Sequence, residues 1–93
     1  MATKILIPTP LRTYTAMQDT IEVEGSTVGE LLSNMTSTYT ELRKHLFTED
    51  GKLRNFVNIY VNDDDIRYLD KEETPVSSDD TVSIVPAVAG GRS

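Results

Sequence analysis

The fold is decided by residues 20–39, TIEVEGSTVGELLSNMTSTY, where one spacing of apolar residues gives way to another. Residues 20–24 alternate with a period of two, which predicts a half-buried strand with Ile21 and Val23 on its core face. Thr27 and Glu30 then have the spacing of a capping box at the start of a helix. Apolar residues recur at helical spacing through the rest of the stretch, namely Val28, Leu31, Leu32, Met35 and Tyr39. The stretch therefore predicts a strand followed by the main helix.

Further strands are predicted on both sides of this helix. Residues 3–7 are rich in β-formers and stop at two prolines, so we expect a first strand that pairs antiparallel with residues 20–24. Residues 56–62 alternate strictly, and residues 81–86 form the last strand. A helix between strands of one sheet indicates a crossover connection. The expected fold class is α+β, with a mixed sheet, one main helix packed on one face, and the other face exposed.

Shorter elements are expected between these. Residues 11–18 are predicted to be irregular, and residues 41–47 to form a second short helix. The acidic turn 62–65 precedes a short strand at residues 66–68, and one helical turn falls within residues 69–74. No internal repeat accompanies them.

Size and composition exclude several classes of function. Ninety-three residues make one domain, and nine basic against fifteen acidic residues give a net charge of -6. This balance argues against nucleic-acid binding and favours a basic protein partner. With no cysteine, the chain has no disulfide framework, iron–sulfur ligands or thiolate zinc site. It also shows no signal peptide and no run of about 20 apolar residues that could span a membrane, so we expect a cytoplasmic protein.

The last strand leads into a tail that contains Gly90 and Gly91. Because glycine has no Cβ, such a tail can thread a narrow channel and present a carboxylate to the active site of another protein. Two glycines near a terminus are also common in unstructured tails, so the dipeptide alone decides nothing. We predict a globular domain over residues 1–86 and a flexible tail over residues 87–93.

Four blocks of the sequence resemble a known family. They are residues 7–12 (IPTPLR), 27–32 (TVGELL), 52–67 (KLRNFVNIYVNDDDIR) and 86–91 (PAVAGG). On these blocks the chain is similar to the ubiquitin-like sulfur-carrier proteins of the ThiS/MoaD family, and within it to the actinobacterial members that serve cysteine biosynthesis. The resemblance implies a β-grasp fold.

The resemblance also implies a role for the tail. In the family, a ubiquitin-activating-like adenylyltransferase uses ATP to adenylate the terminal glycine, here Gly91 after Gly90, and a sulfur donor converts it to a thiocarboxylate. A PLP-dependent cysteine synthase would accept the sulfur, and a metalloprotease would release cysteine and regenerate the tail. The protein would thus be a co-substrate rather than an enzyme, with no bound cofactor and no metal. The lack of cysteine fits, because no internal thiol competes for the acyl-adenylate.

Two residues depart from the family pattern, in which active members end at the second glycine. Here Arg92 and Ser93 follow Gly91. Three interpretations stay open: a precursor trimmed by a protease, residues left over from cloning, or a carrier that has lost its chemistry.

The exposed sheet face is the expected partner surface. In the family this face docks on the activating enzyme, and the residues expected to make the contact here are Leu6, Phe56, Tyr60, Val85, Val88 and Ala89. His45 is expected on a solvated helix face, and Asp63, Asp64 and Asp65 at a solvated hairpin tip that lacks the pattern of a calcium loop.

Three other functions compete with sulfur carriage for cysteine biosynthesis. The chain could be the small subunit of molybdopterin synthase, with its tail inside a larger catalytic subunit. It could be a protein modifier attached to lysines through Gly91. It could also be a β-grasp binding module with an inert tail.

Overall fold

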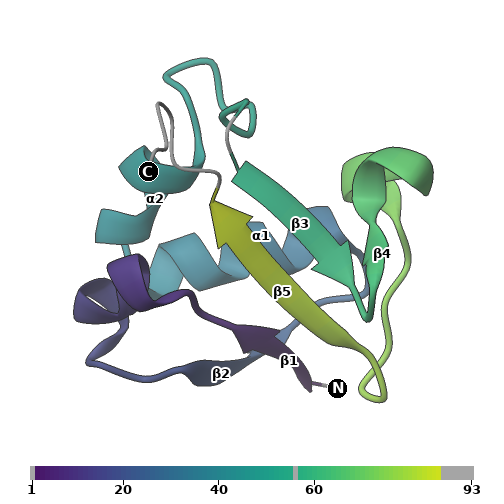
Figure 1. The fold of residues 1–93 in the computed structure, drawn as a ribbon, viewed down its shortest axis with the longest axis horizontal. Helices are drawn as coiled ribbons and strands as arrows, with labels where there is room; N and C mark the ends of the chain where they lie inside the picture. The colour runs from purple at the N-terminus through teal and green to yellow at the C-terminus, as the bar shows by residue number, and fades with distance from the viewer. Residues whose placement is uncertain (1, 56, 87–93) are drawn as a thin grey trace.

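The computed structural model describes residues 2–55 and 57–86. Its sheet has five strands in the order β2-β1-β5-β3-β4 (Figure 1). The strands are β1 (Ala2–Leu6), β2 (Thr20–Glu24), β3 (Val57–Val61), β4 (Asp64–Asp65) and β5 (Thr81–Pro86). β1 pairs antiparallel with β2 and parallel with β5, while β5 pairs antiparallel with β3. The first and last strands therefore lie side by side at the centre of a mixed sheet.

The main helix α1 (Val28–Thr38) begins with the predicted cap. The hydroxyl oxygen of Thr27 accepts a hydrogen bond from the backbone N–H of Glu30 at 3.2 Å. The Glu30 carboxylate reaches back one residue further than a standard capping box, because it accepts from the backbone N–H of Ser26 at 2.9 Å. That backbone bond, helped by the Ser26 hydroxyl, lowers the pKa of the Glu30 carboxyl.

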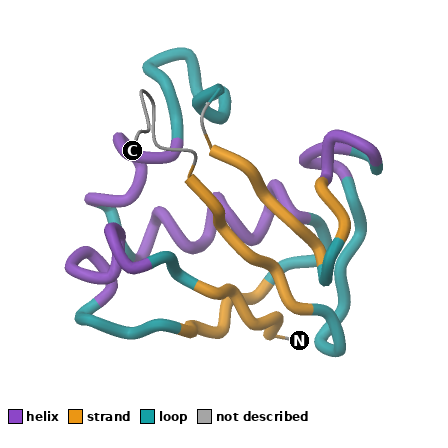
Figure 2. Tube along the Cα trace, viewed as in Figure 1, coloured by secondary structure: helices purple, strands orange, loops and turns teal. Residues whose placement is uncertain are grey.

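α1 lies across one face of the sheet, as Figures 1 and 2 show, and the core fills the space between them. The helix contributes four apolar side chains that are at most 1% exposed, and β3 alternates buried and half-buried residues at the period that the sequence predicts. The short helix α2 (Glu41–Leu46) closes one end of this core. The buried apolar residues are Ile5, Ile7, Leu11, Ile21, Val28, Leu31, Leu32, Met35, Leu42, Leu46, Val57, Ile59, Val61, Ile66, Val82 and Ile84.

Two short segments differ from the prediction. Residues 11–18 were expected to be irregular, but Thr9–Thr15 form the 3-10 helix η1, with Pro10 in its first turn and Leu11 and Thr15 buried. Residues 66–68 were expected to form a strand, but they form the 3-10 helix η2 (Ile66–Tyr68), and the strand is the preceding pair Asp64–Asp65. Asp65 caps η2 by accepting a hydrogen bond from the backbone N–H of Arg67.

The remaining helical turn is η3 (Lys71–Glu73), within the range predicted for it. It packs against α1, where the backbone of Glu72 lies close to Gly29. Within residues 2–55 and 57–86, none of the helices has the length and apolar character needed to cross a bilayer.

Candidate functional site

The side of the sheet turned away from α1 forms a surface that we call the open face. Its described members are Lys4, Leu6, Asn58, Tyr60, Ser83 and Val85. Leu6 and Val85 are 41% and 44% exposed. Register places Ser83 opposite both Leu6 and Tyr60, so three neighbouring strands contribute to one surface.

Three of the predicted partner residues, Leu6, Tyr60 and Val85, thus share the open face. Another of them, Phe56, lies outside the described residues. Exposed apolar side chains grouped on one face are typical of a docking surface, whereas single ones are ordinary. That these residues bind a partner stays a prediction.

The predicted tail residues Val88, Ala89, Gly90 and Gly91 also lie outside the described part of the chain. What the structure provides is their anchor. β5 pairs with β1 as far as Ser83 and with β3 as far as its last residue, Pro86, which lies opposite Val57. The last described residue before the predicted tail is therefore held in the sheet by β3.

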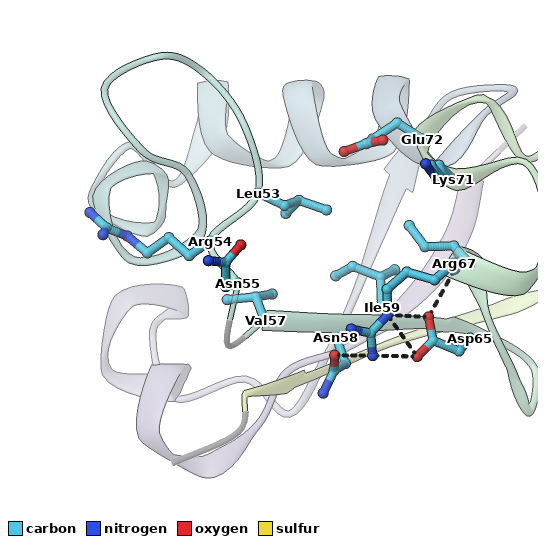
Figure 3. A pocket seen from close by; sticks show the side chains of 11 residues that line it. Leu53, Arg54, Asn55, Val57, Asn58, Ile59, Asp65, Arg67, Lys71 and Glu72 are labelled. Atoms are coloured by element: carbon cyan, nitrogen blue, oxygen red, sulfur yellow. Dashed lines mark hydrogen bonds and ion pairs between the residues drawn. The ribbon is translucent and has the colours of Figure 1, made fainter. Parts of the chain in front are cut away.

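A charge cluster also lies on the open face. Arg67 extends over it and donates to Asp65 and to Asn58 (Figure 3). Its Nη2 atom lies 2.8 Å from the Asp65 Oδ2 atom and 2.6 Å from the Asn58 Oδ1 atom. Asp65 is only 8% exposed, and the hydrogen bonds from the Arg67 side chain and backbone lower its pKa.

A hollow lies along the edge of β3, where β4 covers only Tyr60 and Val61 (Figure 3). Arg54, Arg67 and Lys71 contribute positive charge to it, but the first two are already engaged. Arg54 donates its Nε–H to the backbone carbonyl of Lys44 at 2.9 Å, and Arg67 is held by Asp65. The hollow therefore does not gather free donors at one point, as an anion site requires.

His45 differs from its prediction. It is half-buried rather than solvated, and its ring stacks on Tyr14 with the ring centroids 4.5 Å apart. Its Nε2 atom is buried without a hydrogen-bond partner among the described residues. In the same described ranges, no three His, Cys, Asp or Glu side chains gather in a way that could hold a metal ion.

The mixed five-stranded sheet, the single main helix across one face and the open opposite face define a ubiquitin-like β-grasp domain. The chain belongs to the ThiS family, because the model of that family matches residues 5–91. It is a homologue of the sulfur carrier protein CysO from Mycobacterium tuberculosis, with 40% identity over 93 residues that cover 98% of this chain and 100% of the relative.

Solved structures agree with this placement. The crystal structure of the BexX/CysO complex from Amycolatopsis orientalis contains a chain that matches with a TM-score of 0.87 and 41% identity, over 97% of this chain and 100% of that one. The small archaeal modifier protein 1 of Methanosarcina acetivorans matches with the same TM-score and 26% identity, over 97% and 96% of the two chains. The predicted fold and family are thereby confirmed.

Proposed function

We propose that this chain carries sulfur as a thiocarboxylate on Gly91, once Arg92 and Ser93 have been removed, and supplies that sulfur for cysteine biosynthesis. The observation that carries the proposal is the reach of the family match, which ends at residue 91. The match includes both glycines and stops before the two residues that the proposal requires to be removed. The similarity to CysO over nearly the whole chain supports the cysteine pathway in particular.

The chemistry takes place at the tail. A carboxylate is a poor electrophile, so the Gly91 carboxylate first attacks the α-phosphate of ATP on a ubiquitin-activating-like adenylyltransferase, and pyrophosphate leaves. A sulfur donor then attacks the acyl carbon, AMP leaves, and the terminal oxygen has been replaced by sulfur. The thiocarboxylate sulfur is a nucleophile on a chain with no thiol of its own.

The other enzymes of the pathway supply what this chain does not. ATP belongs to the activating enzyme, and PLP belongs to the cysteine synthase that accepts the sulfur. On that enzyme the thiocarboxylate sulfur becomes the side-chain sulfur of a cysteine, and the Gly91 acyl group then shifts from this sulfur to the cysteine amine. A metalloprotease hydrolyses the resulting peptide bond, which releases the cysteine and frees the Gly91 carboxylate for another cycle. The Leu6, Tyr60 and Val85 side chains of the open face supply apolar contact area for the activating enzyme.

The intact mass of the protein isolated from its own host tests the proposal first. We expect a chain that ends at Gly91, with a fraction heavier by the difference between one sulfur and one oxygen atom. A population found only with Arg92 and Ser93 in place would contradict the proposal, because the Gly91 carboxylate would then be held in a peptide bond.

Pyrophosphate exchange with the activating enzyme of the host provides the matched control. The chain ending at Gly91 should support exchange between ATP and pyrophosphate. The chain that retains Arg92 and Ser93 should not, although the folded domain is the same in both. Equal exchange with both chains would mean that Gly91 is not the reacting residue.

A second candidate function is attachment to other proteins. The similarity to a small archaeal modifier protein favours it, since an activated Gly91 could also acylate a lysine amine. Isopeptide-linked conjugates in extracts of the host would support this function. A thiocarboxylate on Gly91 in the absence of such conjugates would support sulfur carriage and not attachment to proteins.

A further inference from the structure

Tyr68 is the most exposed of the large apolar side chains in residues 2–55 and 57–86, at 87%, and its neighbour Leu69 is 41% exposed. They lie at the end of η2 and immediately after it. Single exposed apolar residues need no explanation, but adjacent ones that share a concave surface mark a contact site more often.

Tyr68 and Leu69 line such a concave surface, which we call the tyrosine hollow. Its lining residues are Tyr60, Asp63, Asp64, Asp65, Arg67, Tyr68 and Leu69. Tyr60 also belongs to the open face, so the hollow continues that face beyond the edge of β3. The open face and the tyrosine hollow are therefore one surface.

The inner side of the tyrosine hollow is held in place. The side chains of Asp65 and Asn58 bind the guanidinium of Arg67 at 2.8 and 2.6 Å, and Asp65 also accepts from the Arg67 backbone N–H at 2.9 Å. A surface that is already ordered loses little side-chain entropy when a partner binds. Since Asp65 compensates the charge of Arg67, this arginine does not repel a basic partner.

The rim of the tyrosine hollow is acidic. Asp63 and Asp64 are exposed, and no side chain in the described ranges pairs with either carboxylate. They stand beside apolar rings on a chain with a net charge of -6. A segment with an apolar side chain flanked by lysine or arginine would complement this acidic rim and the apolar rings beside it.

We propose that the tyrosine hollow binds such a basic, apolar segment of the activating enzyme, and that Tyr68 is the main anchor of this contact. This inference rests on the proposed function, because it names a second contact between the carrier and the enzyme that adenylates it. Tyrosine is enriched among the residues that dominate interface energies, and here its ring is presented with almost no contacts of its own. The hollow would add affinity at a distance from the tail.

The test compares variants of the chain ending at Gly91 in binding to the activating enzyme by calorimetry and in ATP–pyrophosphate exchange. Tyr68→Ala is expected to raise both Kd and the KM for the carrier by about tenfold or more. The kcat should not change, because Tyr68 contacts the partner away from the reacting carboxylate. Tyr68→Phe keeps the ring and should bind as the unsubstituted chain does.

Met17→Ala is the matched control, since Met17 is 73% exposed but lies just after η1, away from the tyrosine hollow. It should change neither constant. Circular dichroism and the urea midpoint verify that each variant is folded. A Tyr68→Ala chain that is adenylated with an unchanged Kd and KM would overturn the inference and leave the proposed function standing. An unsubstituted chain that is neither bound nor adenylated would overturn the proposed function and this inference with it.

Discussion

At the scale of single residues, Asp65 shows how a charge is kept in a nearly buried position. It is 8% exposed, and the Arg67 side chain satisfies its carboxylate together with the Arg67 backbone N–H. These hydrogen bonds favour the ionised form and hold the pKa of Asp65 below its ordinary value of 3.8. A carboxyl with a lowered pKa stabilises the fold above its ordinary pKa and loses that contribution as the pH falls through the folded pKa.

The Arg67→Ala variant tests this linkage. We expect its urea midpoint to be lower than that of the unsubstituted chain near pH 7, because Asp65 keeps its charge without the guanidinium. The difference between the two midpoints should narrow as the pH falls below 3.8, the ordinary pKa of this group, and through the lower pKa that it has in the folded chain. Lys44→Ala is the control, since the Lys44–Glu41 pair has a similar 2.9 Å distance but side chains that are 67% and 62% exposed. It should change the midpoint little at either pH. An equal decrease of the urea midpoint in Arg67→Ala and Lys44→Ala would contradict the conclusion that the burial of Asp65 makes its ion pair important for stability.

Sequence analysis placed Asp65 and His45 in solvent, and both predictions were wrong for the same reason. Asp63 and Asp64 are exposed as predicted, but Asp65 is not, because β-strand geometry and Arg67 bring it onto the sheet. His45 was expected in solvent, yet Tyr14 from η1 stacks on it. Residue type predicts exposure only on average, and the partner that buries a polar side chain is set by the tertiary fold.

At the scale of elements, secondary structure was predicted correctly where apolar residues recur at a regular spacing in the sequence. β2 and β5 have the predicted bounds, and α1 follows the capping signal and its apolar spacing. η1 and η2 were missed because a 3-10 helix of a few residues has no amphipathic period to detect. Their positions depend on local caps and on burial of single residues such as Leu11, which only the folded chain supplies.

The packing of η3 on α1 should determine how a larger residue at Gly29 affects stability. Replacing a helical glycine with alanine normally stabilises a protein by about 1 kcal/mol. At Gly29 the new Cβ would lie 3.1 Å from the backbone oxygen of Glu72 and 3.3 Å from its Cβ. We therefore expect the free energy of unfolding of Gly29→Ala, measured in urea, to show none of this gain. Ser33→Ala, at an exposed position one turn later, is the control and should retain its small gain of about 0.5 kcal/mol. A full gain at Gly29 would mean that η3 moves aside freely.

At the scale of the whole molecule, the negative charge is gathered at one end. Residues 63–80 hold eight acidic and two basic residues, whereas the rest of the chain holds seven of each. This segment contains β4, η2 and η3, and it leads into the start of β5 (Figure 1). β5 then runs away from it to Pro86, the residue after which the tail begins. An approaching basic partner would thus be attracted to the end opposite Pro86, and we expect this attraction to orient the carrier on the enzyme.

Two double charge reversals test whether this attraction depends on where the acidic residues lie or only on the net charge of the chain. Asp63→Lys with Asp64→Lys changes the acidic end, and Glu49→Lys with Asp50→Lys changes an exposed turn elsewhere by the same amount of charge. We expect the first pair to lower the association rate with the activating enzyme by about tenfold at low salt and to flatten its salt dependence. The second pair should have a clearly smaller effect, measured by stopped-flow mixing over a range of salt concentrations. Equal effects would show that the partner responds to the net charge of -6 rather than to its placement. A larger effect of the second pair would place the contact near α2 instead of at the tyrosine hollow.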